Sequence, residues 1–292
     1  MESTVIRFIL SIVSRLPLAL ARILGAAIGQ VAWLCRTRGA KTTLTNLENC
    51  FPHLGTRTRN ALAAKSLRHW GMTVLEIPGI WHRGKKSLNL IRSVKGQDLI
   101  DAALAEGKGL MMVSPHYGNW EVVGYWAATL GPLTTLYQPP RRFDLDDLLQ
   151  QVRAKTGATL VPTNVRGVAS LIKALKQGEL VGILPDMEPE LGSGVFANFF
   201  GVPALTMTLI HNLQQKTNAT VLIGVAQRVP GGFDIVFVDP GKYIASPDPV
   251  TSAEAMNRTI EQLVMLAPEQ YQWEYKRFKR RPDGLAKLYD GK

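Results

Sequence analysis

The sequence predicts an α/β fold, with a largely parallel central sheet covered by helices and an N-terminal helical extension associated with a membrane. From about residue 94 onward, short continuous apolar runs alternate with segments of helical periodicity. Strands that are apolar on both faces are typical of parallel sheets buried between layers of helices. Apolar residues dominate the first 38 positions, and helical patterns fill residues 39–90. We therefore expect a membrane-anchoring or interfacial helix over residues 1–38. One α/β domain should follow over 39–292, with 39–90 as its helical lead-in.

The apolar N-terminal segment allows three interpretations. Residues 16–35 carry a single charge, Arg22, and their length is close to the ~20 residues that a spanning helix needs. A spanning helix would leave the basic residues that follow it on the cytoplasmic side. An interfacial helix would direct its arginines to lipid phosphates, and the interruptions by arginine and by Pro17 favour this or a tilted arrangement. The third interpretation is a helix buried in a protein core.

The rest of the chain divides into helices and strands. Helical patterns cover residues 41–51, 56–82, 120–130, 145–155, 167–176, 204–216 and 251–266. Strand-like runs cover residues 109–114, 133–137, 159–161, 180–184, 219–226 and 233–238. The sequence contains no internal repeat or low-complexity tract that would divide it, so one catalytic domain is expected.

Composition restricts the classes of function. Lys and Arg together number 34 against 23 for Asp and Glu, which gives a formal net charge of +11. This surplus favours anionic partners: nucleic acid, anionic lipid headgroups, phosphorylated substrates or an acidic carrier protein. The sequence lacks phosphate-loop, dinucleotide-binding and DNA-reading patterns, so no nucleic-acid partner is expected. Cys35 and Cys50 have neither disulfide nor zinc-ligand spacing, so no metal is expected.

One segment, residues 114–121, has the residues for acid–base chemistry. It follows a predicted strand and opens a helix, and ligands of open α/β sheets bind beyond the carboxyl ends of the strands. With His116 in the turn and Glu121 in the first helical turn, the carboxylate would fold back on the imidazole and fix its tautomer. Glu121 would also stabilise the imidazolium, while His116 acts as general base on a hydroxyl, a role typically worth ~10²–10⁴-fold in rate. Since no nucleophile elbow is present, direct attack of an acceptor hydroxyl on a thioester is favoured. A structural His–Glu pair is the alternative.

Several short motifs follow one another along the chain. They are Asn46-Leu47 leading to Cys50-Phe51-Pro52, His116-Tyr117-Gly118-Asn119-Trp120-Glu121, Asn164-Val165-Arg166-Gly167, Leu184-Pro185-Asp186, Phe199-Phe200-Gly201-Val202-Pro203-Ala204, and Pro268-Glu269-Gln270-Tyr271-Gln272-Trp273 with Lys276-Arg277-Phe278-Lys279 after it. Together with the apolar N-terminal helix, they resemble the lysolipid acyltransferase superfamily, and within it the late lauroyl and myristoyl transferases of lipid A biosynthesis. The resemblance covers nearly the whole chain.

The resemblance implies transfer of a fatty acyl chain from an acyl carrier protein thioester, or from acyl-CoA, to a hydroxyl of a phosphorylated glycolipid, a lipid A precursor. It implies no metal or redox cofactor. It also implies anionic membrane lipid as a partner, and a place at the bacterial inner membrane with the catalytic domain on the cytoplasmic face.

The resemblance also implies roles for individual residues. His116 and Glu121 would be catalytic. The substrate-binding residues that it implies are Arg153, Arg166, Asp186 and Asn119. The two arginines suit phosphate, because a guanidinium fork matches phosphate oxygens, and Asp186 would order the site or bind substrate.

Several alternatives stay open on the residues alone. The acidic segment 186–190 and Gln138, at a position where the family often has arginine, leave another polar lysolipid as a second acceptor. A non-catalytic lipid- or carrier-binding protein and a hydrolase are the other functions. Phe199 and Phe200 suit either the core or the rim of an acyl-chain pocket. The basic run at 276–281 suits a solvated surface, anionic lipid or an acidic carrier protein.

Overall fold

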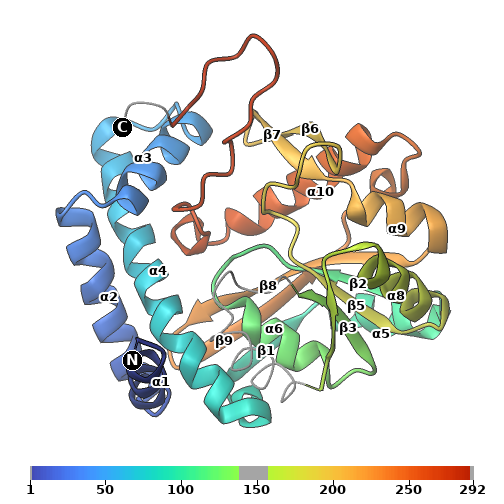
Figure 1. Ribbon diagram of the computed structural model, residues 1–292, viewed down its shortest axis with the longest axis horizontal. Coiled ribbons are helices and arrows are strands. Elements are labelled where there is room, and N and C mark those ends of the chain that lie inside the picture. The colour runs from blue at the N-terminus through green and yellow to red at the C-terminus, as the bar shows by residue number, and fades with distance from the viewer. Residues whose placement is uncertain (1, 138–156, 290–292) are drawn as a thin grey trace.

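The structure, a computed structural model, describes residues 2–137 and 157–289. Within these residues the central sheet has seven strands, in the order β1-β9-β8-β2-β5-β3-β4 (Figure 1). The strands are β1 (Ile91–Lys95), β2 (Leu110–Val113), β3 (Leu133–Tyr137), β4 (Thr159–Pro162), β5 (Leu180–Ile183), β8 (Thr220–Val229) and β9 (Gly232–Val238). Among them β8 and β9 pair antiparallel, and the other neighbours pair parallel. The largely parallel sheet is therefore confirmed.

Helices cover both faces of this sheet (Figure 1). The covering helices are α5 (Gln97–Glu106), α6 (Trp120–Ala127), α8 (Val165–Lys176), α9 (Leu209–Thr217) and α10 (Pro249–Val264). In the central strand β2, Met111 and Val113 join an apolar cluster with side chains of α8, α9 and α10. Leu110 and Met112 point the other way and join a second cluster with side chains of α5 and α6. This alternation explains why the strand is apolar at every position.

One expected helix is partly wrong. Residues 204–207, assigned to a helix, belong to β7 (Val202–Met207), which pairs antiparallel with β6 (Gly194–Phe199), and α9 starts only at Leu209. The hairpin turns at Phe200 and Gly201, whose φ angles are 50° and 74°. Such a turn usually carries Asn-Gly or Asp-Gly, and Phe-Gly at this position is a weak hairpin signal. The Phe200 ring packs on Phe51 at a centroid distance of 5.0 Å, which offsets the cost of a positive φ at a bulky residue.

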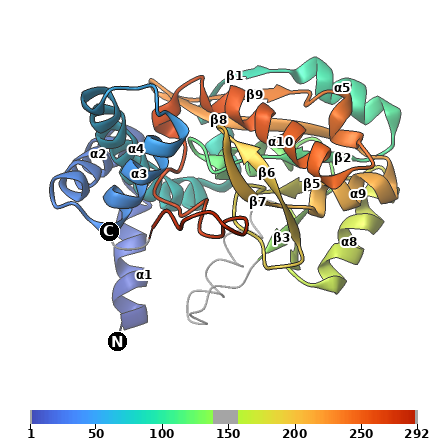
Figure 2. The same cartoon turned by 90° about the horizontal axis from the view of Figure 1, so that it is seen from above.

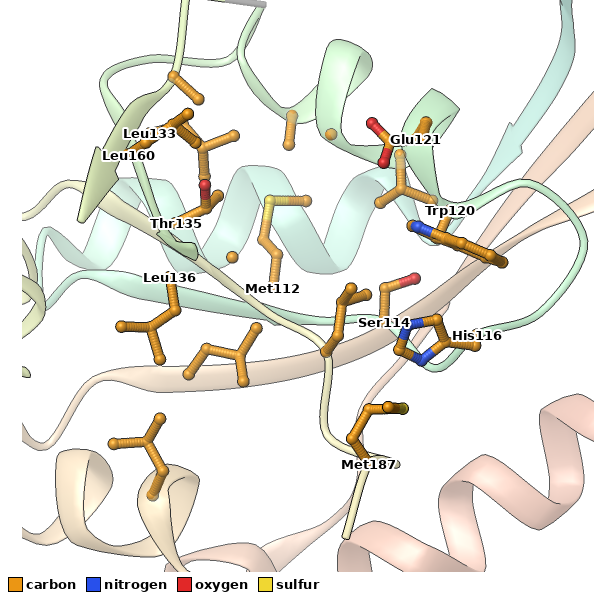
Figure 3. A pocket seen from close by; sticks show the side chains of 18 of the residues that line it. Met112, Ser114, His116, Trp120, Glu121, Leu133, Thr135, Leu136, Leu160 and Met187 are labelled. Carbon is orange, nitrogen blue, oxygen red and sulfur yellow. The ribbon is translucent and has the colours of Figure 1, made fainter. Parts of the chain in front are cut away.

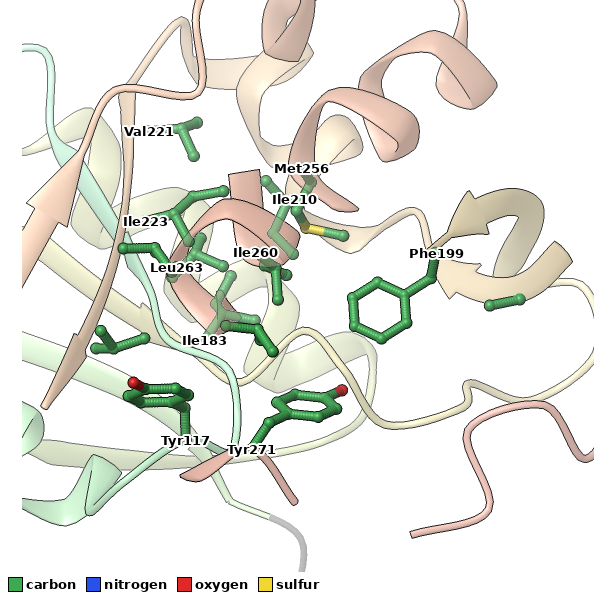
Figure 4. Packing of buried hydrophobic residues seen from close by; sticks show 14 of the residues in the cluster. Tyr117, Ile183, Phe199, Ile210, Val221, Ile223, Met256, Ile260, Leu263 and Tyr271 are labelled. Carbon is green, nitrogen blue, oxygen red and sulfur yellow. The ribbon is translucent and has the colours of Figure 1, made fainter. Parts of the chain in front are cut away.

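Phe199 belongs to the core between the sheet and α10. Its side chain is 1% exposed, and its ring lies 5.7 Å from that of Tyr271 between centroids. Figure 4 shows it beside Ile260 and Met256 of α10. Of the two interpretations of this motif, core packing therefore holds for Phe199.

Four helices precede the sheet: α1 (Glu2–Val13), α2 (Leu18–Leu34), α3 (Arg38–Cys50) and α4 (Thr56–Arg83). The apolar N-terminal segment is broken at Pro17, which caps α2, and α1 projects from the body of the protein (Figure 2). In the described part of the chain, no single helix has the length and apolar character to cross a membrane. The bent pair α2 and α3 passes that test together, with an angle of 80° between its helices.

Helix α2 is fixed to α4 by close backbone contact. Gly25 and Gly29 face α4, and a Cβ on Gly25 would lie 2.4 Å from the carbonyl oxygen of Gly71. Small residues one turn apart allow two helices to approach this closely. The Arg22 guanidinium also points inward and pairs with Glu76 at 2.7 Å. The expectation that this arginine faces lipid phosphates is therefore wrong, because a buried carboxylate on α4 holds it.

The opposite face of α2 and the end of α1 expose apolar side chains. They are Phe8, Ile9, Ile12, Leu20, Ile23, Leu24, Ile28, Val31 and Leu34. Single exposed apolar residues are ordinary, but many of them on two successive helices indicate an interaction surface. We call this group the apolar N-terminal face.

The glycine contact predicts a selective loss of stability. Gly25→Val should lower the free energy of unfolding by about 1–3 kcal/mol, because the added side chain overpacks against backbone that cannot move aside cheaply. Ile23→Val, on the exposed face of the same helix, should change it by less than about 0.5 kcal/mol. Urea unfolding of the detergent-solubilised proteins measures both. Equal urea midpoints for the two variants would contradict the close contact of Gly25 with α4.

Candidate functional site

A histidine and an aspartate meet beyond the ends of two neighbouring parallel strands. Val113, the last residue of β2, pairs with Ile183, the last residue of β5, and His116 and Asp186 each follow at the same offset in the chain. Oδ1 of Asp186 lies 2.7 Å from Nδ1 of His116. Oδ2 accepts the backbone N–H of His116 at 2.8 Å. The carboxylate therefore fixes both the ring and the backbone of the histidine.

This contact sets the protonation of the imidazole. Burial would lower the pKa of His116, but the Asp186 carboxylate outweighs it, and the pKa rises above the usual 6.5. Burial would raise the pKa of Asp186, whereas His116 holds it below the usual value. The ionised carboxylate keeps the proton of the neutral imidazole on Nδ1 and leaves Nε2 to accept another.

Glu121 does not make the contact that fixes the tautomer, so the prediction is wrong on this point. Asp186 takes that position on Nδ1, while Oε2 of Glu121 accepts a hydrogen bond from the Trp81 indole at 3.0 Å. The Trp120 ring packs edge-on against the imidazole, with centroids 4.7 Å apart, and in the view of Figure 3 it lies between Glu121 and His116. The physical reason is the pairing of β2 with β5, which brings a distant carboxylate closer than the local one.

A pocket of about 370 Å³ opens beside the imidazole. Most of its lining is apolar: Met112, Val123, Ala127, Leu133, Leu136, Leu160, Ile183, Leu184, Met187, Met207 and Leu209. In Figure 3, His116 and Trp120 lie at one end, and Leu133 and Leu160 lie toward the other. Such a lining suits an aliphatic chain, because each methylene that it removes from water contributes ~0.8 kcal/mol.

Ser114 is a pocket residue to which the sequence analysis gave no role. Its hydroxyl is buried and has no hydrogen-bond partner among the described residues, yet Ser114 lines the pocket and stands next to His116 in Figure 3. An unpaired buried hydroxyl costs ~1–3 kcal/mol, so a ligand oxygen would be a favourable partner. The sequence held a signal for both Ser114 and Asp186, since each lies beside a proline that follows a buried strand.

Asn119 lies behind the site, and the prediction that it binds substrate is wrong. The residue is fully buried, and its amide donates to Oε2 of Glu76 at 3.2 Å. Arg228 pairs with the same oxygen at 2.7 Å and donates to the carbonyl of Gly118. This buried charge network holds the turn that follows His116.

The turn itself requires a glycine at position 118. Its φ is +57°, and a Cβ would lie 1.9 Å from the carbonyl oxygen of Ala226. The Gly118 N–H donates to the carbonyl of Gln270 at 3.0 Å, and the Thr73 hydroxyl donates to the Gly118 carbonyl at 2.9 Å. The loop that bears His116 is thereby tied to β8, to α4 and to the segment near residue 270.

The two predicted phosphate-binding arginines have different outcomes. Arg166 is exposed in the first turn of α8, and Thr163, just before that helix, lines the pocket. Arg153 and the helix expected over 145–155 lie outside the described residues, as does Gln138.

The basic run at 276–281 is not a uniformly solvated surface. Arg277 is buried, and it donates to the carbonyl of Leu205 at 2.7 Å and to the hydroxyl of Thr206 at 2.8 Å. It therefore fastens the C-terminal segment to β7, whereas the two lysines of the run remain exposed.

The Asp186 contact predicts a shift in the titration of His116. In the wild type the imidazole should titrate above pH 6.5. In Asp186→Asn the midpoint should fall, because burial then acts without the opposing charge. NMR titration of side-chain ¹⁵N-labelled histidine measures both midpoints, and His116→Gln identifies the signal. A midpoint that stays or rises in Asp186→Asn would refute the assigned cause.

Comparison with known proteins identifies the family of this chain. The sequence model of the family described as bacterial lipid A biosynthesis acyltransferase matches residues 3–280. The lipid A biosynthesis lauroyltransferase of Escherichia coli is 29% identical over 284 residues, which cover 96% of this chain and 92% of that protein. A lipid A biosynthesis acyltransferase of Haemophilus influenzae is 31% identical over 269 residues, covering 91% and 82%. A phosphatidylinositol mannoside acyltransferase of Mycobacterium tuberculosis is 29% identical over 159 residues, covering 53% and 49%. The chain therefore belongs to the bacterial lipid A biosynthesis acyltransferase family and is an O-acyltransferase, as its ordered motifs predicted.

Proposed function

We propose that this chain transfers a fatty acyl group from an acyl carrier protein thioester, or from acyl-CoA, to a hydroxyl of a lipid A precursor. The observation that carries the proposal is the His116–Asp186 pair at one end of an apolar pocket of about 370 Å³. The pocket can bury the hydrocarbon chain, and the imidazole can accept the proton of the alcohol. Family membership supports a lipid A precursor as acceptor. The mycobacterial relative, named for a phosphatidylinositol mannoside, makes another polar lipid the alternative.

His116 is the general base in this mechanism. Nε2 takes the proton of the acceptor hydroxyl as its oxygen forms a bond to the thioester carbonyl carbon. Asp186, on the far side of the ring, stabilises the imidazolium that results. The tetrahedral intermediate then collapses, the carbon–sulfur bond breaks, and the leaving sulfur receives the proton from His116. The products are the ester and the free thiol of the carrier.

Direct attack agrees better with the pocket than an acyl-enzyme does. A serine nucleophile should be hydrogen-bonded to its base, whereas the Ser114 hydroxyl has no partner among the described residues. We assign Ser114 to the carbonyl oxygen of the thioester, where a donated hydrogen bond stabilises the negative charge of the intermediate. The N-terminus of α6, which starts at Trp120, adds a partial positive charge nearby.

Glu121 and the arginines complete the site. The Trp81 indole holds the Glu121 carboxylate at the pocket wall, where its negative charge favours the imidazolium form of His116. Arg166, exposed at the start of α8, is assigned to the phosphate of the acceptor, a contact for which a guanidinium is well suited. Arg153 is proposed for the same contact.

The apolar N-terminal face supports a position of the enzyme at a membrane. Its residues lie on α1 and α2, and a helix of this kind inserts its apolar side into the headgroup boundary. The lipid acceptor would then reach the site from the bilayer. We assign the protein to the cytoplasmic face of the bacterial inner membrane, with anionic lipid and acidic acyl carrier protein as partners that its net charge of +11 attracts.

Acyl transfer by purified variants tests this function. With lauroyl–acyl carrier protein and a lipid A precursor, the wild type should form the acylated lipid, detected by mass spectrometry. His116→Ala should lose ~10²–10⁴-fold in kcat, and Asp186→Asn should lose less. Wild-type protein that forms no acylated lipid would indicate a binding protein. Fatty acid released at the full transfer rate without acceptor would indicate a hydrolase.

The raised pKa of His116 predicts the pH dependence of the reaction. The base must be neutral, so kcat/KM should fall as the pH drops through a midpoint above 6.5. In Asp186→Asn this limb should move to lower pH, since the ring loses its proton more readily. A steady-state pH profile measures both limbs. A wild-type limb centred below pH 6 would contradict His116 as the titrating base.

The apolar N-terminal face predicts a loss of membrane affinity on substitution. Ile23→Ser with Val31→Ser should weaken binding to phosphatidylglycerol vesicles by more than about tenfold, because each lost side chain removes about 1–2 kcal/mol of apolar burial. Val165→Ser with Leu266→Ser, two exposed positions elsewhere, is the matched control. Vesicle flotation measures the bound fraction, and equal losses in both pairs would remove the special role of this face.

A further inference from the structure

A second, smaller cavity reaches the imidazole from the side of α4. It measures about 60 Å³. Among the described residues, His116 and Trp120 line both this cavity and the large apolar pocket. Its other walls include Thr73 and Val74 of α4 and Glu274 of the C-terminal segment. The large pocket extends toward β3, β4 and β5 instead, away from His116 in the view of Figure 3.

Glu274 gives this cavity a chemical character of its own. Both of its carboxyl oxygens are buried and accept no hydrogen bond of good geometry from any described residue. Burial raises the pKa of Glu274 to about 7, so the group is largely protonated at slightly acidic pH. The segment is fixed against the base, because the N–H of Gln272 donates to the carbonyl of His116 at 3.0 Å. The Gln272 side chain lies near enough to oppose this rise in pKa, but neither carboxyl oxygen has a well-aligned donor. Such a buried group needs an explanation, and a ligand atom in the cavity supplies one.

In the proposed reaction the acceptor alcohol and the acyl thioester must both come close to Nε2 of His116. The acceptor oxygen must lie within hydrogen-bond reach of Nε2 and about 3 Å from the thioester carbon. An acyl chain that fills the apolar pocket occupies one side of His116, so the alcohol must arrive from another side. The small cavity is such a side, and about 60 Å³ holds roughly four water-sized groups. It therefore has room for a hydroxyl and its neighbouring carbons, and none for a second acyl chain.

We propose that the small cavity is the acceptor subsite, where Glu274 donates a hydrogen bond to the oxygen of the alcohol that will be acylated. The alcohol's own proton then remains free for Nε2 of His116, and one lone pair of its oxygen remains free for attack. This inference rests on the proposed function and names the side from which the hydroxyl enters. The ligand class is the hydroxyl-bearing end of a lipid.

Kinetics with both substrates varied separately tests the assignment. The donor is lauroyl–acyl carrier protein, and the acceptor is the lipid A precursor from a strain that lacks late acylation. Glu274→Leu should raise the KM for the acceptor by about tenfold, the loss of one hydrogen bond to a buried group, and leave the KM for the donor within about twofold. Glu274→Gln keeps a donor and should recover part of the loss. Val74→Phe, at a half-exposed wall position, should act like Glu274→Leu by filling the cavity.

Two control variants separate the subsites. Gly124 lines the apolar pocket and has no atom within 4 Å of a built Cβ, so Gly124→Leu should raise the KM for the donor and spare the KM for the acceptor. Glu269→Leu removes a carboxylate from the same C-terminal segment, where it pairs with the exposed Lys65, and should change neither KM.

Each remaining outcome overturns the assignment. A raised donor KM in Glu274→Leu and Val74→Phe would give the cavity to the acyl chain or to the carrier. Wild-type values for both substrates in both variants would make the cavity a structural one. These failures differ from failure of the proposed function, in which wild-type protein itself forms no acylated lipid. Circular dichroism on every variant confirms that the fold is retained.

Discussion

The hydrogen bond between the Asp186 carboxylate and Nδ1 of His116 is the interaction on which the site depends. It joins two strand ends in the middle of the sheet, where β2 and β5 pair in register up to Val113 and Ile183. Neither residue has the other near it in sequence, so their contact is a product of parallel pairing. A slip of one residue would turn each strand's side chains to the opposite face and separate the pair. Such a slip would also exchange the β2 side chains between the two apolar clusters into which they pack, so close packing opposes it.

Support for the pair comes from the side of α4. The buried Glu76 carboxylate pairs with Arg22 of α2 and Arg228 of β8, and it accepts from Asn119 in the turn that bears the base. Burial would raise the pKa of Glu76, but the two arginines hold it below its usual value, so the carboxylate stays charged. The Glu76 carboxylate therefore connects α2, β8 and the turn after His116. The helix that carries the apolar face and the turn that carries His116 are thus mechanically joined, and α4, which lies between them, also lines the proposed acceptor cavity.

The sequence was most informative where the signal is local. Apolar runs located most of the strands, and the position of His116 after one of them pointed to the site. The partner of His116 could not be chosen locally, because Glu121 is near in sequence while Asp186 is near only after β2 and β5 pair. The β6–β7 hairpin was missed since Phe200 occupies a turn position where small residues are the usual signal. On the sequence alone Arg22 is a candidate for lipid phosphates and Asn119 for the substrate, and only tertiary packing directs both side chains to Glu76.

Two carboxyl groups near the imidazole have opposite surroundings, and this difference suits the buried histidine to the proposed role of general base. Asp186 accepts two hydrogen bonds from His116, which hold its pKa low despite burial. Glu274 has no well-aligned donor among the described residues, and burial outweighs the nearby Gln272 side chain and raises its pKa to about 7. If both were fully ionised, the second negative charge would raise the pKa of His116 further and leave less neutral imidazole at physiological pH. When their surroundings make the pKa values of two carboxyl groups differ in this way, the two groups can take different roles. In the proposed mechanism one carboxylate stabilises the imidazolium, and the other, protonated in a large fraction of molecules up to about neutral pH, donates to the alcohol.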